Sequence, residues 1–348
     1  MKNSKTKYIP LDRFIYKALY DKKKGYYMNK NPFGKNGDFI TAPQISILFS
    51  EMLAIWCIAF WEKLGCPKKI NIIELGAGNG DMMNEMIKVF DKFNKFKSSS
   101  NYFILEKSHL LKKIQEKKLN SHKIIWLNSL NKLKKGPNIF LANEFFDALP
   151  IKQFVKKKNK WFEKKIKING TNKFELIDRK TNIKNLEKKI GFNLSDNQNI
   201  IEFSPLTYEY FNIISKKINN LKGGMLIIDY GYLEKKMRDS LQSVYKHNFN
   251  SIMDNLGNSD ITYNVNFFLL KKIAKKLNLK VVGITSQKKF LTKLGILNRA
   301  EKISEKLTFL EKSDLYYRLK RLIDKNLMGE LFKVMFVTKK NIKFKIGF

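Results

Sequence analysis

The chain has 348 residues, of which 43% are hydrophobic and 28% charged, so it can bury a large core and is neither disordered nor fibrous. The length suggests about two domains, or one domain with sizeable insertions. Only six of the 68 basic residues are arginine, and the lysines that give the net charge of +37 are spread along the whole chain. This charge raises the affinity for phosphates or an acidic partner, but an even spread is more typical of a solvated surface than of a specific nucleic-acid site.

Residues 1–66 are predicted to form a helical segment ahead of the main domain. A basic helix covers about 11–23, a turn-rich stretch follows, and an apolar helix occupies 45–61. The apolar helix contains Glu51 and is shorter than the roughly 20 residues that cross a bilayer, and the first residues carry no apolar signal segment. We therefore expect no membrane span, and a bacterial protein of the cytoplasm.

From residue 70 the chain alternates between short apolar strands and helices. Strands are predicted at 70–75, 102–106, 124–127, 139–142, 223–229, 280–284 and 331–337, and helices at 81–90, 110–118, 205–219 and 266–277. Continuous apolar strands separated by helices predict an α/β fold with a parallel sheet that is covered on both faces.

Two segments interrupt this alternation and are predicted to be insertions. Residues 151–199 contain alternating strands and an Asn-Gly turn signal at 169–170, which predict an antiparallel insertion. Residues 232–262 are predicted to form an irregular insertion on the substrate side. The core domain would then comprise the three remaining segments, 67–150, 200–231 and 263–348.

The first predicted strand runs into a glycine-rich turn, Glu74-Leu-Gly-Ala-Gly-Asn-Gly80. Alternate glycines let the backbone turn tightly and approach a ligand, and the following helix points its amino end at that ligand. Glu106 ends the second strand, where a carboxylate can accept hydrogen bonds from ribose hydroxyls. The GxGxG pattern and the 30 residues between Gly76 and Glu106 differ from the nicotinamide fingerprint and favour S-adenosylmethionine (SAM) over a dinucleotide.

A second polar cluster, Asn143-Glu144-Phe-Phe-Asp147-Ala-Leu-Pro150, follows the fourth predicted strand. Ligands of open α/β sheets bind outside the carboxyl ends of the strands, so this loop should lie beside the methyl donor. The alternative is that Asn143 and Asp147 only cap the following turn. Three polar groups in a lysine-free apolar segment favour a role toward the substrate.

Further lysine-free polar segments are candidates for the same edge of the sheet. They are Gly37–Pro43, which includes Asp38 and Thr41, and the segments 201–205, 228–231 and 260–262. The first of them is expected to be a lid over the cofactor, although a turn with a helix cap would also explain it. Glu202 and Ser204 in the second could be a helix N-cap before Pro205.

The two cysteines and three histidines show no spacing that would indicate a metal site, a disulfide framework or a nucleophile with its base. We therefore expect no metal.

Seven segments in this order resemble the MidA-type SAM-dependent methyltransferases, a family that includes mitochondrial complex I assembly-factor arginine methyltransferases. The segments are GYY (25–27), GDFITAP (37–43), ELGAGNG (74–80), NEFFDALP (143–150), EFSP (202–205), IDYG (228–231) and DIT (260–262). The resemblance spans about 25 to 337 and implies a Rossmann-like, seven-stranded class I methyltransferase sheet with a family-specific insertion. It also implies SAM as cofactor and, at least for the mitochondrial members, symmetric dimethylation of an arginine in a respiratory complex I subunit. Ala77 and Asn79 depart from the Pro and Arg that members often carry, but they only flank the glycines.

These observations assign roles to ten residues. Glu74, Gly76, Gly78 and Gly80 would hold the methionine part of SAM, Glu106 its ribose, Asp38 and Thr41 would close over it, and Glu144, Asp147 and Asn143 would act on the acceptor. Glu144 is expected to grip an arginine guanidinium, with Asp147 as second candidate and Asn143 orienting the loop. Two other functions stay open: a nucleic-acid methyltransferase, which the charge favours, and a non-catalytic assembly factor that binds SAM.

Overall fold

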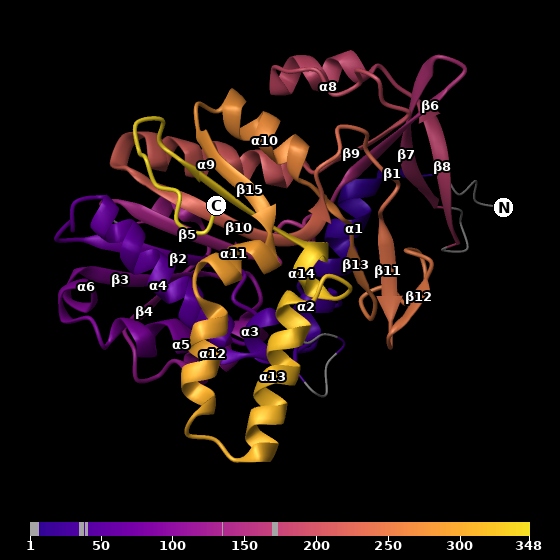
Figure 1. Cartoon of the computed structure of the whole chain (residues 1–348). Coiled ribbons are helices and arrows are strands. Elements are labelled where there is room, and N and C mark those ends of the chain that lie inside the picture. Colours follow the sequence, from indigo (N-terminus) through magenta and orange to yellow (C-terminus); the bar gives the residue numbers. More distant parts are fainter. Residues whose placement is uncertain (1–6, 35–37, 39–40, 134, 169–172) are drawn as a thin grey trace.

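The computed structural model describes residues 7–34, 38, 41–133, 135–168 and 173–348. Its centre is a large sheet whose strands lie in the order β15-β16-β10-β5-β2-β3-β4 (Figure 1). Their bounds are Ile70–Leu75 (β2), Ser100–Leu105 (β3), Ile124–Leu127 (β4), Asn138–Asn143 (β5), Gly223–Tyr232 (β10), Lys280–Ser286 (β15) and Phe332–Thr338 (β16). Only β16 runs antiparallel to its neighbours, and the short β14 (Val265–Asn266) pairs with the end of β10. The predicted α/β fold with a seven-stranded sheet is confirmed.

Helices cover both faces of this sheet, because successive side chains of each strand point to opposite sides. Ile73 packs into one core and its neighbour Ile72 into the other. The first core is shared with α1 (Leu11–Tyr20), α9 (Pro205–Leu221) and α10 (Phe267–Lys276). The second is shared with α4 (Ile47–Lys63), α5 (Asp81–Phe90), α11 (Gln287–Lys293), α12 (Ile296–Ser304) and α13 (Phe309–Ile323). Burial on both faces explains why the strands are nearly continuous apolar runs.

The insertion after β5 forms a second, antiparallel sheet. Its strands are β1 (Lys7–Pro10), β6 (Lys152–Lys157), β7 (Lys160–Ile168), β8 (Phe174–Lys180) and β9 (Ile200–Phe203), and α8 (Ile183–Ile190) lies between β8 and β9. Two strands differ from the prediction. β1 belongs to the segment that was expected to be helical, and it pairs with β7. β9 was assigned to the core domain but pairs with β6. The Asn-Gly turn at 169–170 lies outside the described residues, and the division into domains stays a prediction.

Residues 232–262 were expected to be irregular but form a small antiparallel sheet. Its strands are β11 (Gln242–Tyr245), β12 (Asn248–Asn250) and β13 (Asp260–Thr262). Strands of three or four residues are too short to show a periodic pattern in the sequence. Glu202 at the end of β9 holds this sheet in place, since its buried carboxylate accepts hydrogen bonds from Ser240 N at 3.0 Å and Leu241 N at 3.1 Å.

No element was predicted between β15 and β16, where the structure has α11, α12, α13 and α14 (Met328–Leu331). α12 and α13 project from the body as a pair (Figure 1). The remaining helices are α2 (Tyr26–Asn29), α3 (Ala42–Ile45), α6 (Asn94–Ser99), α7 (His109–Lys118) and the 3-10 turn Leu130–Lys132. Among the residues that the structure describes, no helix combines the length and apolar character needed to cross a membrane.

Candidate functional site

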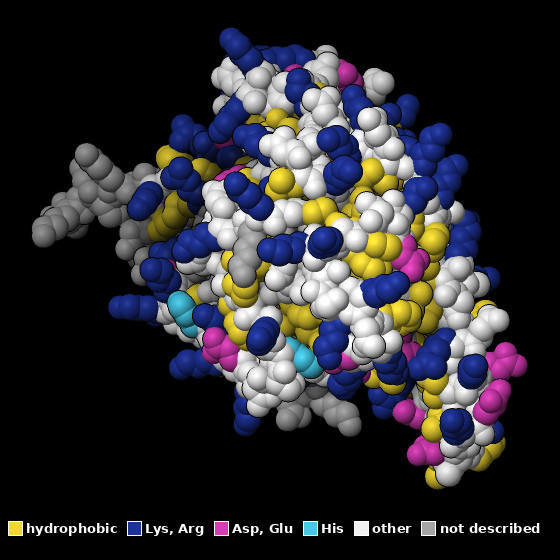
Figure 2. Space-filling model, turned by 90° about the vertical axis from the view of Figure 1, so that its left-hand side faces the viewer, with side chains coloured by type: hydrophobic (Ala, Val, Ile, Leu, Met, Phe, Trp, Pro, Cys, Tyr) yellow, Lys and Arg dark blue, Asp and Glu magenta, His cyan; other side chains and the backbone are white. Residues whose placement is uncertain are grey.

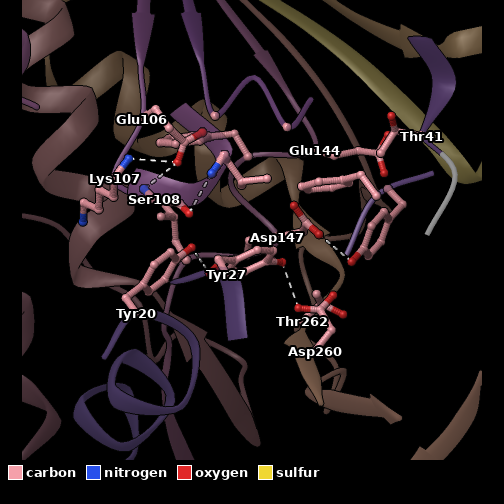
Figure 3. A pocket seen from close by; sticks show the side chains of 18 of the residues that line it. Tyr20, Tyr27, Thr41, Glu106, Lys107, Ser108, Glu144, Asp147, Asp260 and Thr262 are labelled. Atoms are coloured by element: carbon pink, nitrogen blue, oxygen red, sulfur yellow. Dashed lines mark hydrogen bonds between the residues drawn. The ribbon is translucent and has the colours of Figure 1, made fainter. Parts of the chain in front are cut away.

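A cavity of about 450 Å³ opens at the carboxyl ends of the parallel strands (Figure 3). Adjacent strands bring Glu106 after β3, Gly76 after β2, Glu144 after β5 and Tyr230 on β10 to this edge in that spatial order. The other lining residues are Tyr20, Tyr27, Phe33, Thr41, Gly78, Leu105, Lys107, Ser108, Leu111, Phe145, Asp147, Ala148, Leu149, Tyr210, Gln242, Val244, Asp260, Thr262, Asn264 and Leu331. The position is the one expected for a ligand of an open α/β sheet.

The glycine-rich turn needs glycine for its backbone and for the space above it. Gly76, Gly78 and Gly80 have φ of +67°, +52° and +80°. Gly76 and Gly78 line the cavity, and a Cβ on Gly76 would lie 3.0 Å from the Phe145 ring. Gly80 is not among the lining residues, because it starts α5 and faces Gln115 of α7. We expect Gly80 to shape the turn rather than touch a ligand.

Replacing Gly76 with alanine is expected to weaken SAM binding by about tenfold or more. A side chain on this left-handed backbone costs roughly 1–2 kcal/mol of strain. The new methyl group would also enter the cavity beside Phe145. Isothermal titration with SAM measures the change. Gly65→Ala is the matched control, since Gly65 has φ of +88° and open space around it. Equal SAM affinity of the wild type and Gly76→Ala would place the cofactor elsewhere.

Glu106 is fixed at the end of β3 by three hydrogen bonds. Its Oε1 accepts from Lys107 N at 2.9 Å and Ser108 N at 2.8 Å, and its Oε2 accepts from Gln115 Nε2 at 3.0 Å. Gln115 also donates to Gly78 O at 2.8 Å, so it connects the carboxylate to the glycine-rich turn. Burial raises the pKa of Glu106. An oriented carboxylate beside the turn suits a ribose with two neighbouring hydroxyls.

Glu74 and Asn143 lie behind the turn rather than in the main cavity. Both line a smaller pocket of about 40 Å³ that also reaches Thr41 and Glu144. Glu74 is 3% exposed, and burial, followed by the charges of Asp81 and Glu106, raises its pKa to about 8. Its Oε2 makes no hydrogen bond with the described residues. A cation in the adjoining cavity would stabilise this carboxylate.

The loop after β5 brings two carboxyl groups into the cavity. Glu144 has φ of +49°, a conformation rare for a residue with a side chain, and its N–H donates to Ile228 O at 2.9 Å. Burial, with the nearby charge of Asp147, raises the pKa of Glu144 to about 8. Asn143 Nδ2 lies 3.3 Å from Glu144 Oε1 and donates to it. Asn143 is therefore placed to orient the Glu144 side chain, and its role in orienting the loop stays a prediction.

Asp147 is only 5% exposed, and its carboxylate lines the cavity. Tyr230 Oη donates to its Oδ2 at 2.6 Å, whereas Oδ1 has no hydrogen-bond partner of good geometry within the described part of the chain. Burial raises the pKa of Asp147 to about 6. Backbone N–H groups of Ala148 and of Asp147 itself lower this pKa, so a role of Asp147 as a turn cap stays open beside its role toward a ligand.

Asp229 lies within β10 and holds the loop after β5 in shape. It is fully buried, and its Oδ2 accepts from Phe146 N at 3.0 Å and Asp147 N at 3.3 Å, while Oδ1 accepts from Tyr230 N at 3.1 Å. The polar segment 228–231 thus fixes the backbone of the loop after β5 through the hydrogen bonds of Asp229.

Another part of the cavity wall consists of residues to which no individual role was assigned from the sequence. Tyr27 Oη donates to Asp260 Oδ1 at 2.8 Å, and Tyr20 Oη donates to Ala148 O at 3.1 Å (Figure 3). Asp260 is 4% exposed, and burial raises its pKa to about 7 despite the Tyr27 hydrogen bond. The GYY and DIT segments were signals for Tyr27 and Asp260, but no pattern indicated that they meet.

The two residues of the predicted lid separate in the structure. Thr41 lines the cavity and begins α3, where it forms a capping box with Gln44. Asp38 is not among the lining residues, since its carboxylate accepts hydrogen bonds from Tyr26 Oη and Lys30 Nζ, both at 2.7 Å. Asp38 thus binds the first and the C-terminal flanking residue of α2, and its assignment to the cofactor stays a prediction.

Most of the Asp, Glu, Lys and Arg side chains that line the cavity are acidic, although the whole chain is strongly basic. Four carboxyl groups line it (Glu106, Glu144, Asp147 and Asp260), against one cationic side chain among the described lining residues, Lys107. Buried carboxylates without a cationic partner are costly, so the cavity favours a positively charged ligand.

Comparison with known proteins identifies the family. Residues 52–285 match the family described as "Putative S-adenosyl-L-methionine-dependent methyltransferase". The chain belongs to this family. It is 27% identical to the mitochondrial protein arginine methyltransferase NDUFAF7 of Xenopus laevis, over 93% of this chain and 80% of that protein. It is 28% identical to the Drosophila melanogaster homologue, over 85% of this chain and 73% of that protein.

A solved structure of a COG1565 superfamily member from Burkholderia thailandensis, bound to S-adenosyl-homocysteine, has the same fold. Its TM-score is 0.83 at 22% sequence identity, over 98% of this chain and 90% of that chain. The predicted membership in the MidA-type methyltransferases is confirmed, and so are the enzyme class and SAM as cofactor.

The residues of this methyltransferase fit SAM. Gly76 leaves a cradle that a Cβ would fill, and the unpaired Oε2 of Glu74 and Oδ1 of Asp147 suit a cationic ligand. Gly76 and Gly78, with Glu74 behind them, would hold the methionine part, and Glu106 the ribose. Glu144 and Asp147 would then lie on the side toward which SAM presents its methyl group, since β5 lies beside β2 in the sheet.

Proposed function

We propose that this methyltransferase acts on an arginine side chain of a protein. The observation that carries the proposal is the set of buried carboxyl groups, Glu144, Asp147 and Asp260, on the side of the cavity away from Glu106. A guanidinium is planar, stays charged and presents five N–H donors, so it can bind several carboxylates at once. The names of the relatives, which are protein arginine methyltransferases, support the same acceptor.

The chemistry requires alignment and the removal of one proton. Bound SAM supplies an electrophilic methyl group, whose transfer to nitrogen breaks the carbon–sulfur bond and leaves the electron pair on sulfur. Glu144 and Asp147 hold the guanidinium so that one nitrogen faces the methyl group. Formation of the nitrogen–carbon bond releases one proton from that nitrogen, because the methylated product keeps a single positive charge. Glu144, whose pKa of about 8 makes it a stronger base than an ordinary glutamate, takes this proton.

The charge distribution favours a protein acceptor over a nucleic acid. Lysine and arginine side chains are scattered over the face seen in Figure 2 rather than gathered beside one groove. The cavity itself is lined by carboxyl groups, which repel phosphates. Both features fit a cationic side chain that enters an acidic cavity.

A respiratory complex I subunit is the substrate that the family resemblance suggests, and we include it in the proposal. The cytoplasmic, bacterial setting stays a prediction, whereas the relatives are named as mitochondrial proteins.

The test uses SAM with a tritium-labelled methyl group and an extract of cells that lack this enzyme. Label is expected in protein and, after acid hydrolysis, in methylarginine, with Gly76→Ala enzyme as the negative control. Label in RNA or in methyllysine would overturn the proposal in favour of another acceptor. SAM binding by calorimetry without any transfer would instead identify a non-catalytic binding protein.

A further inference from the structure

We infer that Asp260 and Asp147 form the two sides of a seat for the acceptor guanidinium, and that Tyr27 is the positioning residue for Asp260. The inference rests on the proposed function and adds a residue outside the methyltransferase sheet to the acceptor site. Asp147 comes from the loop after β5, whereas Asp260 comes from β13 of the small sheet.

The two aspartates are held in matching ways. Tyr230 Oη donates to Asp147 at 2.6 Å, and Tyr27 Oη donates to Asp260 at 2.8 Å. The two carboxyl groups are 5% and 4% exposed and line one cavity, where they lie on the same side (Figure 3). A tyrosine hydroxyl thus orients each carboxylate and leaves it facing the cavity.

The electrostatics of the two aspartates favour a positive charge between them. The charge of Asp147 acts on Asp260 and disfavours its ionised form, so the two groups are close enough to repel each other. Asp147 Oδ1 is buried without a hydrogen-bond partner of good geometry, as far as the described residues go. An N–H donor that also carries positive charge would satisfy both conditions.

The shape of the cavity selects among cations. Tyr27, Phe33, Phe145 and Tyr230 line it together with the aspartates. A flat guanidinium can stack on aromatic faces while its edges donate to two carboxylates, whereas a lysine ammonium is a compact point charge with three donors. The seat therefore prefers arginine to lysine.

The arrangement separates acceptor binding from donor binding. Glu106, with Lys107 and Ser108, lies on the side opposite Asp147 and Asp260 (Figure 3). Removal of the Asp260 charge should therefore weaken the acceptor and leave SAM unaffected.

The experiment compares Asp260→Asn with Asp254→Asn, a matched change at an exposed position of the same insertion. The probe for binding is ethylguanidinium, titrated into enzyme saturated with S-adenosyl-homocysteine, with propylammonium as the comparison cation. Asp260→Asn should weaken ethylguanidinium binding and raise the KM of the arginine substrate by about tenfold or more, with unchanged SAM affinity. Wild type and Asp254→Asn should agree in every measurement and bind propylammonium more weakly.

Tyr27→Phe tests the positioning role. It should raise the acceptor KM while kcat changes little, and the double variant Tyr27→Phe/Asp260→Asn should be no worse than Asp260→Asn alone. If Asp260→Asn misfolds and loses SAM binding, the acceptor KM of Tyr27→Phe tests instead whether Asp260 binds the guanidinium.

The outcomes separate this inference from the proposed function. Wild-type enzyme that binds ethylguanidinium through Asp260 but methylates no arginine would overturn only the proposed function. If wild-type enzyme and Asp260→Asn methylate arginine with the same KM, the proposal that Asp260 binds the acceptor is wrong. If Asp260→Asn misfolds, the same conclusion follows when wild type and Tyr27→Phe have the same KM.

Discussion

Replacing Glu144 with glutamine is expected to lower kcat for arginine methylation by about 10²- to 10⁴-fold, the range for loss of a general base. Glutamine keeps the size of the side chain and the backbone at φ of +49°, but it can neither carry the negative charge nor take up the proton. Initial rates with labelled SAM and saturating acceptor measure the effect. Affinity for SAM, measured by calorimetry, should stay as in the wild type, because Glu144 lies on the acceptor side. A glutamine variant with the full methylation rate would refute the catalytic role.

The same residue should shape the pH dependence. The carboxylate form of Glu144 grips the guanidinium and accepts the proton, so kcat/KM should rise as the pH increases through about 8. Asp147, with a pKa of about 6, and Asp260, at about 7, lose their protons earlier on the same rise. In Glu144→Gln the remaining activity should level off at lower pH than in the wild type. A wild-type profile that falls between pH 6 and 8 would contradict this sign.

Replacing Asp229 with alanine is expected to destabilise the protein and to abolish methyl transfer. The carboxylate of Asp229 accepts three backbone hydrogen bonds at the edge of the cavity, and the change leaves these donors without a partner. Each buried donor without a partner costs about 1–3 kcal/mol, so the free energy of unfolding should fall by roughly 3 kcal/mol or more. Urea unfolding followed by circular dichroism measures it.

Asp229→Asn is the control for this prediction, since it keeps one oxygen that can accept part of these hydrogen bonds. We expect it to lose less stability than Asp229→Ala. If both variants unfold at the wild-type urea concentration, another group must hold the loop after β5.

The sequence predicted the central sheet well because its signals are local. The strands Ile70–Leu75 and Ile124–Leu127 and the helix Asp81–Phe90 have the predicted bounds. Buried parallel strands are short apolar runs, and an amphipathic helix repeats its apolar positions, so each can be read from a few neighbouring residues. The glycine-rich turn and the loop after β5 were placed at one edge because the carboxyl ends of parallel strands meet there.

Two of the features that were missed depend on distant contacts. β1 has four residues and is defined by its pairing with β7, far along the chain. The meeting of Tyr27 with Asp260 likewise joins two segments without a shared local pattern. α13 is different, because its start has a local signal: Thr308 and Glu311 form a capping box.

The N-cap predicted for Glu202 and Ser204 holds for only one of these two residues. Ser204 caps α9 by accepting from Thr207 N at 3.2 Å, as the N-cap interpretation required. Glu202 instead holds residues 240 and 241, which lead into the sheet that carries Asp260. A buried glutamate before a helix can serve either purpose, and only the fold shows which.

The place of β16 has a consequence for biosynthesis. This strand follows β15 in the chain but lies between β15 and β10 in the sheet. Both β15 and β10 therefore lack this pairing partner until β16 has been synthesised. During translation, the apolar strand β10 therefore waits with one edge unpaired, and such edges invite aggregation. A nascent chain that stops short of β16 should depend on chaperones to stay in solution.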